Sequence, residues 1–281
     1  VHNPKENVED VIIIIDTDED RATYGREFVW IPVGENIKKK DGTTFDITLG
    51  RYVYKEDGTI DTSLSKTEPT GQLRNSLADS IYYTEGLKDT PTTNTHAKDI
   101  EAFISKVKTT GGYYIARYEA RTKAERTAPT NDEGLTQLTV KPDEYVYNFV
   151  TQPQAASLSQ NMYLENSNFT SDLMNSYTWD TAITFIQECS GDTDYSMQNS
   201  INSDLANKGT NNLSDKDEKC NIYDMASNCY EWTTEVCSDS SFPCVFRGGT
   251  YEYSNYHTAT RYQGNTTTCP DYRSFRPILY L

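Results

Sequence analysis

The stretch from Asn221 to Trp232, NIYDMASNCYEW, restricts the possible folds of this chain more than any other segment. Acidic and amide side chains alternate here with large apolar and aromatic ones, and the apolar positions do not follow the spacing of one helical face. We therefore expect an irregular loop that leads into a buried tryptophan, Trp232. Two later segments accompany it, Phe246 to Thr250 (FRGGT) and Ser274 to Pro277 (SFRP). We expect the remainder of the chain to pack around these three segments.

The three segments resemble the signature of the formylglycine-generating enzyme family, the sulfatase-modifying branch of the C-type-lectin-like fold. Members have a segment of the form N-x-Y-D-M-x-G-N-x-x-E-W, then R-G-G-S, then a terminal G-F-R, and both order and spacing match here. Weaker similarities at 28–33 and 111–119 correspond to two family strands. The resemblance implies an α+β fold, with irregular loops around a small mixed or antiparallel sheet and two or three helices.

The same resemblance implies a single domain over residues 1–281. Residues 1–95 should form a β-rich N-terminal portion, and residues 96–281 should contain the helices, the signature loop and the C-terminal binding region. Apolar periodicity and turn residues agree with this division. They predict strands at 11–15, 28–33 and 113–118, a hairpin turn at 38–42, helices at 96–109, 152–163 and 171–189, and long polar loops at 59–95 and 191–219.

Composition and length of apolar runs exclude nucleic-acid binding and a membrane-spanning segment. The formal net charge is -16 and the pI is about 4.6, so we expect no nucleic-acid binding, which requires a basic surface. No apolar run is long enough to cross a bilayer. Because the chain begins with Val1, we expect a processed chain or one without its natural N-terminus, and a membrane association only through a missing N-terminal anchor.

The six cysteines all lie in the last third of the chain, and none forms the C-x-x-C pair of a zinc site. With only three histidines, far apart in the sequence, we expect no zinc centre. We expect buried thiols together with one or two disulfides. Cys237 and Cys244 are the best candidates for a bridge, because a turn in the short segment between them would bring their Cα atoms within range.

The family resemblance implies a structural calcium ion in the signature loop, since such a hard cation takes six to eight oxygen ligands. By position, Asp224 and Glu231 would supply side-chain oxygens, and Ser227 and Cys229 would supply backbone carbonyls. The glycine usual at the position of Ser227 is absent. The alternative is that Asp224 caps a turn and Glu231 pairs with Arg247.

The resemblance also locates the catalytic positions of the family, two cysteines shortly after R-G-G-S that bind copper. Here Tyr253 and Thr258 occupy these positions, and neither side chain can ligate copper as a thiolate. We therefore expect no copper and no formylglycine-generating activity. Iron-dependent relatives need a histidine trio that this sequence does not offer.

The segment after R-G-G-T has the composition of a recognition surface. Stiff amphipathic tyrosines supply contact area and short polar side chains supply hydrogen bonds, as in antibody paratopes. Such a composition resembles the variable proteins of diversity-generating retroelements, which share the lectin-like fold. The alternative is ordinary half-buried strands with tyrosines on a wet face. The candidate ligand-binding residues are Tyr251, Tyr253, Asn255, Tyr256, His257, Thr258, Arg261, Tyr262, Asn265 and Tyr272.

We expect this face to project outward from a buried scaffold. The scaffold residues should be buried or conformationally constrained: Trp232, Arg247, Gly248, Gly249 and Arg276. The expected function is an extracellular or cell-surface binding protein, bacterial or phage, for a protein or glycan on another cell or host surface. The alternatives are an oxidoreductase of the formylglycine type, active or degenerate, and a structural surface component such as a pilus or adhesin tip.

Overall fold

The computed structural model describes residues 24–39, 41–63, 100–129, 138–142, 144–164, 166, 168–199, 217–237 and 241–281, together with short strands at 13–15, 72–73 and 81–82. The fold is α+β, as the sequence predicts. No helix of the described part of the chain combines the length and apolarity needed to span a membrane.

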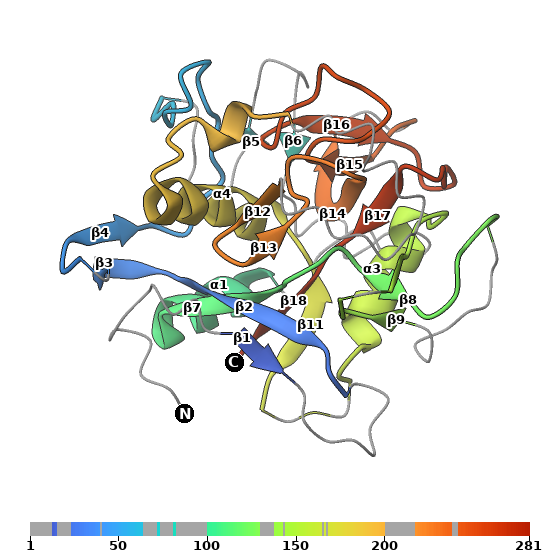
Figure 1. Ribbon diagram of the computed structural model, residues 1–281, viewed down its shortest axis with the longest axis horizontal. Helices are drawn as coiled ribbons and strands as arrows, with labels where there is room; N and C mark the ends of the chain where they lie inside the picture. The colour runs from blue at the N-terminus through green and yellow to red at the C-terminus, as the bar shows by residue number, and fades with distance from the viewer. Residues whose placement is uncertain are drawn as a thin grey trace.

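A five-stranded antiparallel sheet lies at the centre of the fold (Figure 1). Its second and third strands are those that the sequence predicts at 28–33 and 113–118. The strand nearest the C-terminus pairs in the middle of the sheet. In spatial order the strands are β1 (Ile13–Ile15), β2 (Glu27–Pro32), β7 (Gly112–Ala116), β18 (Pro277–Tyr280) and β11 (Thr170–Leu173).

A second sheet carries the signature segments. Its central strand is β14 (Tyr230–Cys237), which pairs antiparallel with β15 (Cys244–Arg247) and β6 and parallel with β17 (Arg273–Phe275). The edge strands are β16 (Arg261–Gly264) and β5 (Gln72–Leu73), and β6 (Ile81–Tyr82) lies between β5 and β14. The smaller pairings are β3 (Gly34–Lys38) with β4 (Thr44–Ile47), β12 (Glu218–Lys219) with β13 (Ile222–Tyr223), and β8 (Arg121–Thr122) with β9 (Leu138–Thr139) and β10 (Tyr145–Val146).

The helices begin at side-chain caps that the sequence supplies. Thr151 caps α3 (Gln152–Asn161), and Asn175 caps α4 (Ser176–Ser190). In each case the cap side chain accepts from the backbone N–H of the third helical residue, and the backbone N–H of the cap donates to the side chain of that same residue. Helix α1 (Ile100–Thr110) is held by its apolar face, which is buried in the core. A short 3-10 turn, η2 (Tyr195–Met197), follows α4.

The predicted helix at 171–189 is therefore wrong over its first five residues. Residues 170–173 form β11 and pair with β18, and the helix begins only after the Asn175 cap. Apolar Leu173 fits both a strand and a helix face, so periodicity alone placed the start too early.

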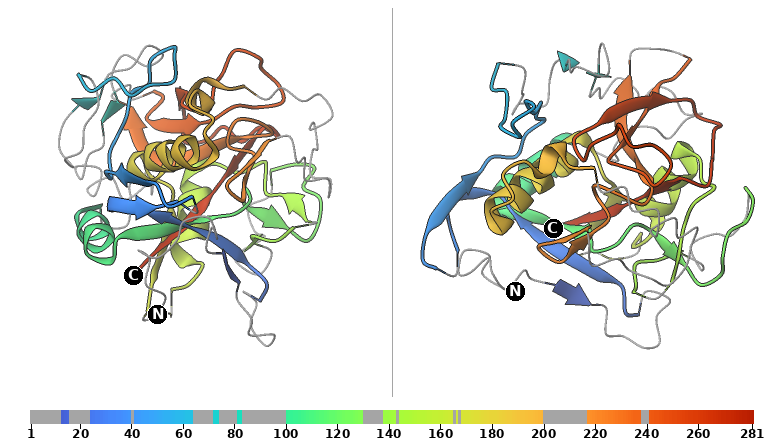
Figure 2. Two further views of the ribbon diagram at one scale, coloured as in Figure 1. Left: turned by 60° about the vertical axis from the view of Figure 1, so that its left-hand side comes forward. Right: turned by 45° about the horizontal axis from the view of Figure 1, so that its top comes forward.

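The central sheet separates two apolar cores, because successive side chains of a strand point to opposite faces. In β2, Val29 and Ile31 join the core that contains α1 and α4, whereas Phe28 joins the core that contains α3 and Trp232. Both faces of this sheet are thus covered. Figure 2 shows α4 between the two sheets, where it contacts β2, β4 and β14.

The predicted Cys237–Cys244 bridge is wrong. Cys244 is a buried free thiol, and in the strand register it lies opposite Val236 rather than Cys237. Cys189 and Cys220 are also free thiols and interact with each other, and this contact together with burial raises the pKa of Cys189.

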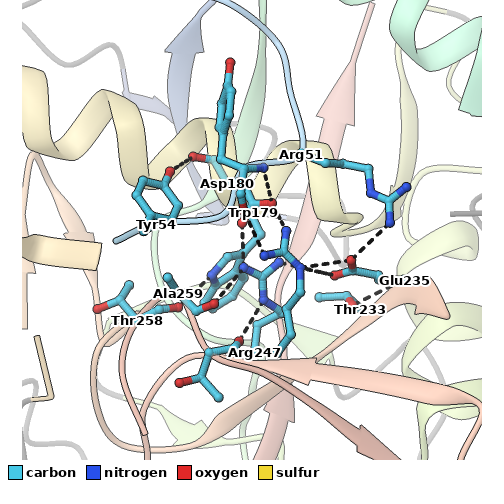
Figure 3. A network of polar contacts seen from close by, with 12 residues as sticks. Arg51, Tyr54, Trp179, Asp180, Thr233, Glu235, Arg247, Thr258 and Ala259 are labelled. Carbon is cyan, nitrogen blue, oxygen red and sulfur yellow. Dashed lines mark hydrogen bonds and ion pairs between the residues drawn. The ribbon is translucent and has the colours of Figure 1, made fainter. Parts of the chain in front are cut away.

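Helix α4 is joined to the second sheet by an ionic network from which water is excluded (Figure 3). Asp180 of α4 accepts from Arg247 of β15 at 2.5 Å and from Arg261 of β16, and both arginines also contact Glu235 of β14, at 3.3 and 3.0 Å. Arg51 reaches Glu235 at 3.6 Å. The five side chains are at most 1% exposed.

We expect Asp180→Ala to destabilise the fold by about 3–5 kcal/mol, because the variant leaves Arg247 and Arg261 buried without one carboxylate. The matched control is Glu188→Ala in the same helix, whose ion pair with Lys39 is partly exposed and should contribute less than about 1 kcal/mol. Chemical denaturation measures both losses. Similar small losses for the two variants would contradict the structural role of the network.

Candidate binding face

The R-G-G segment fixes the signature loop by close backbone approach. A Cβ atom at Gly249 would lie 2.1 Å from the carbonyl oxygen of Ala226, and one at Gly248 would lie 2.7 Å from that of Met225. Gly248 also has φ +88°, a conformation that only glycine adopts at little cost. Beyond the glycines, the Tyr251 amide donates to the Asn228 carbonyl at 2.9 Å. The loop and the segment that follows R-G-G therefore hold each other in place.

The scaffold expectation is confirmed. Trp232, Arg247 and Arg276 are fully buried, and the two glycines are constrained as described above. Trp232 donates its indole N–H to the Val150 carbonyl at 2.9 Å.

The partner expected for Glu231 is different. Glu231 lies opposite Arg247 in the backbone register of β14 and β15, but its carboxylate pairs with Arg276 through two hydrogen bonds of 2.6 and 3.0 Å. Arg247 instead turns to Asp180 and Glu235. Glu231 and Arg247 are thus cross-strand neighbours in the backbone register without forming an ion pair, because the Arg276 guanidinium binds the Glu231 carboxylate.

The four residues expected to hold calcium lie together in the buried signature loop, but their carboxylates already have partners. Asp224 lies 3.7 Å from Arg121, and Glu231 is held by Arg276. No group of three metal-ligating side chains is found among the described residues. Calcium binding by Asp224, Ser227, Cys229 and Glu231 stays a prediction.

Two further buried carboxylates, which the sequence did not reveal, bind the signature loop from neighbouring segments. Glu119 accepts from the backbone N–H of Cys229 at 2.9 Å and from the Asn228 side chain. Burial and the neighbouring carboxylates Asp224 and Glu231 raise the pKa of Glu119 well above its ordinary value. Asp217 accepts from Tyr195, Ala226 and Ser227 at 2.7–3.0 Å. Burial and then the charge of Asp224 raise the pKa of Asp217 to about 7.

Four of the candidate binding residues form one surface group, which we call the tyrosine cluster: Tyr253, Tyr256, Tyr262 and Tyr272. Ring centroids lie 6.1 Å apart for Tyr253 and Tyr256, 5.7 Å for Tyr253 and Tyr272, and 5.5 Å for Tyr256 and Tyr262, all nearly perpendicular. Tyr253 is 42% exposed and Tyr262 is 40% exposed. Edge-to-face packing of this kind fixes the rings without burying them.

Beneath the cluster lies a floor of buried aromatic rings. Tyr230 contacts Phe246 at 4.7 Å and Tyr256 at 5.3 Å, and Phe246 contacts Trp232 at 5.5 Å. The tyrosines thus rest on the core that surrounds Trp232, so the predicted recognition surface and the predicted scaffold are in direct contact.

A neighbouring segment supports the loop that carries Tyr253 and Tyr256. The Thr258 amide donates to the Gln198 carbonyl at 3.0 Å, and the Ala259 amide donates to the Ser196 carbonyl at 2.9 Å. Asn199 donates its side-chain amide to the Tyr256 carbonyl. Residues 196–199 therefore fix the position of this loop through hydrogen bonds.

Of the six remaining candidates, four are exposed or half-buried and two are buried. Asn255 is exposed, and Tyr251, His257 and Asn265 are half-buried, with the Asn265 side chain closing a local turn onto Thr267 and Thr268.

Two candidates are buried, Arg261 and Thr258, and the predicted outward projection of Arg261 was wrong. Arg261 is 1% exposed because Asp180 and Glu235 bind its guanidinium, and Thr258 is 0% exposed. The Thr258 carbonyl accepts from the Trp179 indole at 2.9 Å.

Sequence reasoning missed Arg273, which lies between the cluster and its floor. Its guanidinium carbon is 4.1 Å from the Phe246 ring centroid, 4.9 Å from that of Trp232 and 5.8 Å from that of Tyr272. The available signal was the alternation of Tyr272, Arg273 and Ser274 just before the buried Phe275, which places Arg273 on a strand beside the tyrosines.

No protein-family profile matches the chain, and no curated protein matches it in sequence. Among solved structures, variable protein 1 of Treponema denticola matches with a TM-score of 0.39 and 14% identity, covering 60% of this chain and 84% of that protein. PvdO of Pseudomonas aeruginosa matches with a TM-score of 0.46 and 12% identity, covering 96% of this chain and 98% of that one. CarF matches with a TM-score of 0.39 and 14% identity, covering 90% and 98%. All three scores lie below 0.5, so the sulfatase-modifying-factor type of the fold stays a prediction.

The raised pKa of Asp217 predicts a pH-dependent stability. Its folded-state pKa of about 7 exceeds the ordinary 3.8, so its contribution is full at low pH and is lost as pH rises to about 7. Between these values the free energy of unfolding should fall by on the order of 1 kcal/mol per pH unit from this group. Asp217→Asn should remove that share of the slope in urea unfolding at pH 5, 6, 7 and 8.

Asp192→Asn serves as the control, because Asp192 is half-buried beside Lys219 and its pKa is lowered. That variant should leave the slope between pH 5 and 8 unchanged. An unchanged slope in Asp217→Asn would show that Asp217 is ionised in the folded protein throughout this range.

Proposed function

We propose that the chain is a ligand-binding protein and that the tyrosine cluster is its contact surface. One observation carries the proposal: four tyrosines, two from one loop and two from later segments, meet as one packed and partly exposed group over a rigid aromatic floor. Large rings with few rotatable bonds give contact area at low entropic cost, and their hydroxyls supply adaptable hydrogen bonds. Clusters of Tyr with Trp and Arg beneath them have the composition of binding hot spots.

The setting of this surface supports external recognition. The chain is strongly acidic, with a formal net charge of -16, which favours solubility and discourages adhesion to nucleic acid. We propose an extracellular or cell-surface location and a partner on another cell or host surface. The competing structural-component function would need a repeated self-contact instead of a ligand, so the concentration dependence of the oligomeric state separates the two.

We further propose that this surface belongs to a diversified receptor of the retroelement type. The proposal rests on the Tyr-rich and Asn-rich composition of 251–272 and on the anchoring of that segment at both ends by buried residues. A reverse-transcriptase gene beside this one, and sibling copies that differ at Tyr253, Asn255 and Tyr262 but not at Arg261, would support it.

Removing the exposed rings should separate binding from stability. In the double variant Tyr253→Ala and Tyr262→Ala, each truncation should cost about 1 kcal/mol of stability or less, while binding should weaken by on the order of 2 kcal/mol or more. Thermal unfolding and an array of bacterial-surface and host glycoproteins measure the two effects. Tyr24→Ala is the matched control, since Tyr24 is also 40% exposed but lies outside the cluster. Unfolding of the double variant would show that the rings are core.

We also propose that the protein has no formylglycine-generating activity. The family's two cysteine positions hold Tyr253, an exposed ring, and Thr258, whose backbone and hydroxyl are bound to the Gln198 carbonyl. Incubation with copper and a sulfatase-motif peptide should therefore yield no aldehyde above a no-protein control. Aldehyde formation would restore the oxidoreductase alternative.

A further inference from the structure

Arg273 is half-buried, and its guanidinium has two solvent-shielded nitrogen atoms without a hydrogen-bond partner in the part of the chain that the structure describes. Its Nε and Nη1 atoms are shielded from solvent, and no described residue accepts a hydrogen bond from them. The guanidinium lies over three aromatic rings, those of Phe246, Trp232 and Tyr272. Burial lowers the pKa of Arg273, yet a guanidinium keeps its proton in proteins.

Other arginines stacked on rings of this protein have hydrogen-bond acceptors. Arg126 lies 4.4 Å from the Tyr147 ring centroid and donates to the Asn148 carbonyl at 2.7 Å. Arg117 lies over Tyr118 and Tyr223 and pairs with Glu27 at 2.7 Å. Stacking by itself therefore does not explain why Arg273 lacks an acceptor, because a buried donor left unpaired costs about 1–3 kcal/mol.

A second unpaired group accompanies Arg273. The Tyr230 side chain is 2% exposed, and its hydroxyl has no hydrogen-bond partner among the described residues. This hydroxyl is near enough to the Arg273 guanidinium to interact with it electrostatically. Two donors beneath the tyrosine cluster thus lack an acceptor, and the exposed rings of Tyr253 and Tyr262 lie above them.

We propose that Arg273 and Tyr230 receive a single carboxylate of a protein partner, an aspartate or glutamate side chain that enters the tyrosine cluster. A carboxylate offers the acceptor oxygens that both donors lack, and its bond to guanidinium is charge-assisted. The acidic chain repels polyanions at long range, which favours one carboxylate in an otherwise apolar segment. Surrounding Tyr and Trp rings suit a protein hot spot. This assignment rests on the proposed ligand-binding function.

The test uses the full chain and two capped pentapeptides, acetyl-Ala-Phe-Glu-Phe-Ala-amide and its Gln counterpart. They differ only in the carboxylate. Binding is followed through the Nε–H NMR signal of Arg273, assigned by its loss in Arg273→Lys or by nuclear Overhauser contacts to the Phe246 and Trp232 rings. The Glu peptide should shift this signal saturably, and the Gln peptide should bind at least tenfold more weakly. Equal affinities, or no shift with either peptide, would overturn the proposal.

Variants and a sugar acid complete the design. Arg273→Lys should weaken the Glu peptide at least tenfold, because lysine lacks the planar fork, whereas the stacked control Arg126→Lys should not. If Arg273→Lys fails to fold, the comparison of the two peptides on the unmodified protein decides. Glucuronate binding as tightly as the Glu peptide would overturn the assignment to a protein side chain. Equal Glu and Gln affinities that both vanish in the Tyr253 and Tyr262 double variant would overturn this inference while leaving the binding face intact.

Discussion

The ionic network around Asp180 is the interaction on which the rest of the structure depends. Its members come from α4, from three strands of the second sheet and from the segment near Arg51, so it joins parts of the chain more than 200 residues apart, such as Tyr52 and Arg261, which are linked at 2.8 Å. Three arginines face two carboxylates, and backbone carbonyls of Tyr52, Ala259 and Thr260 accept further hydrogen bonds from Arg261 and Arg247. A buried network of this kind is a weak source of net stability but a strong source of specificity, since each member is costly to leave alone.

The network also fixes the position of the tyrosine cluster, because strand β16 carries a member of each, Arg261 and Tyr262. Arg261 points inward to the network while its neighbour Tyr262 is 40% exposed, and the loop that holds Tyr253 and Tyr256 is tied to residues 196–199 after α4. The cluster is therefore presented on rigid elements, which lowers the entropy lost when a ligand binds. Changes confined to exposed rings leave the network untouched.

Local signals in the sequence predicted the local parts of this arrangement. The glycines after Arg247, the buried Trp232 and the strands around Phe28 and Tyr113 followed from motif and periodicity, and the gathering of tyrosines followed from composition. The outward placement of Arg261 was wrong because its burial depends on Asp180 and Glu235, which lie far away in the sequence and read as ordinary polar positions of a helix and a strand. Arg273 and the carboxylates Glu119 and Asp217 escaped prediction for the same reason: their environments are assembled from distant segments.

The position of β18 has a consequence for how the chain reaches this state. This strand, at 277–280, lies between β7 and β11 in the middle of the central sheet. Synthesis must therefore reach Tyr280 before the sheet can close, and until then β7 exposes an unpaired edge next to the apolar side chains of both cores. Such long-range pairing makes folding slow and leaves the nascent chain open to aggregation. In this protein β18 is therefore an interior partition between β7 and β11, and the two sides of the central sheet cannot join before this strand is in place.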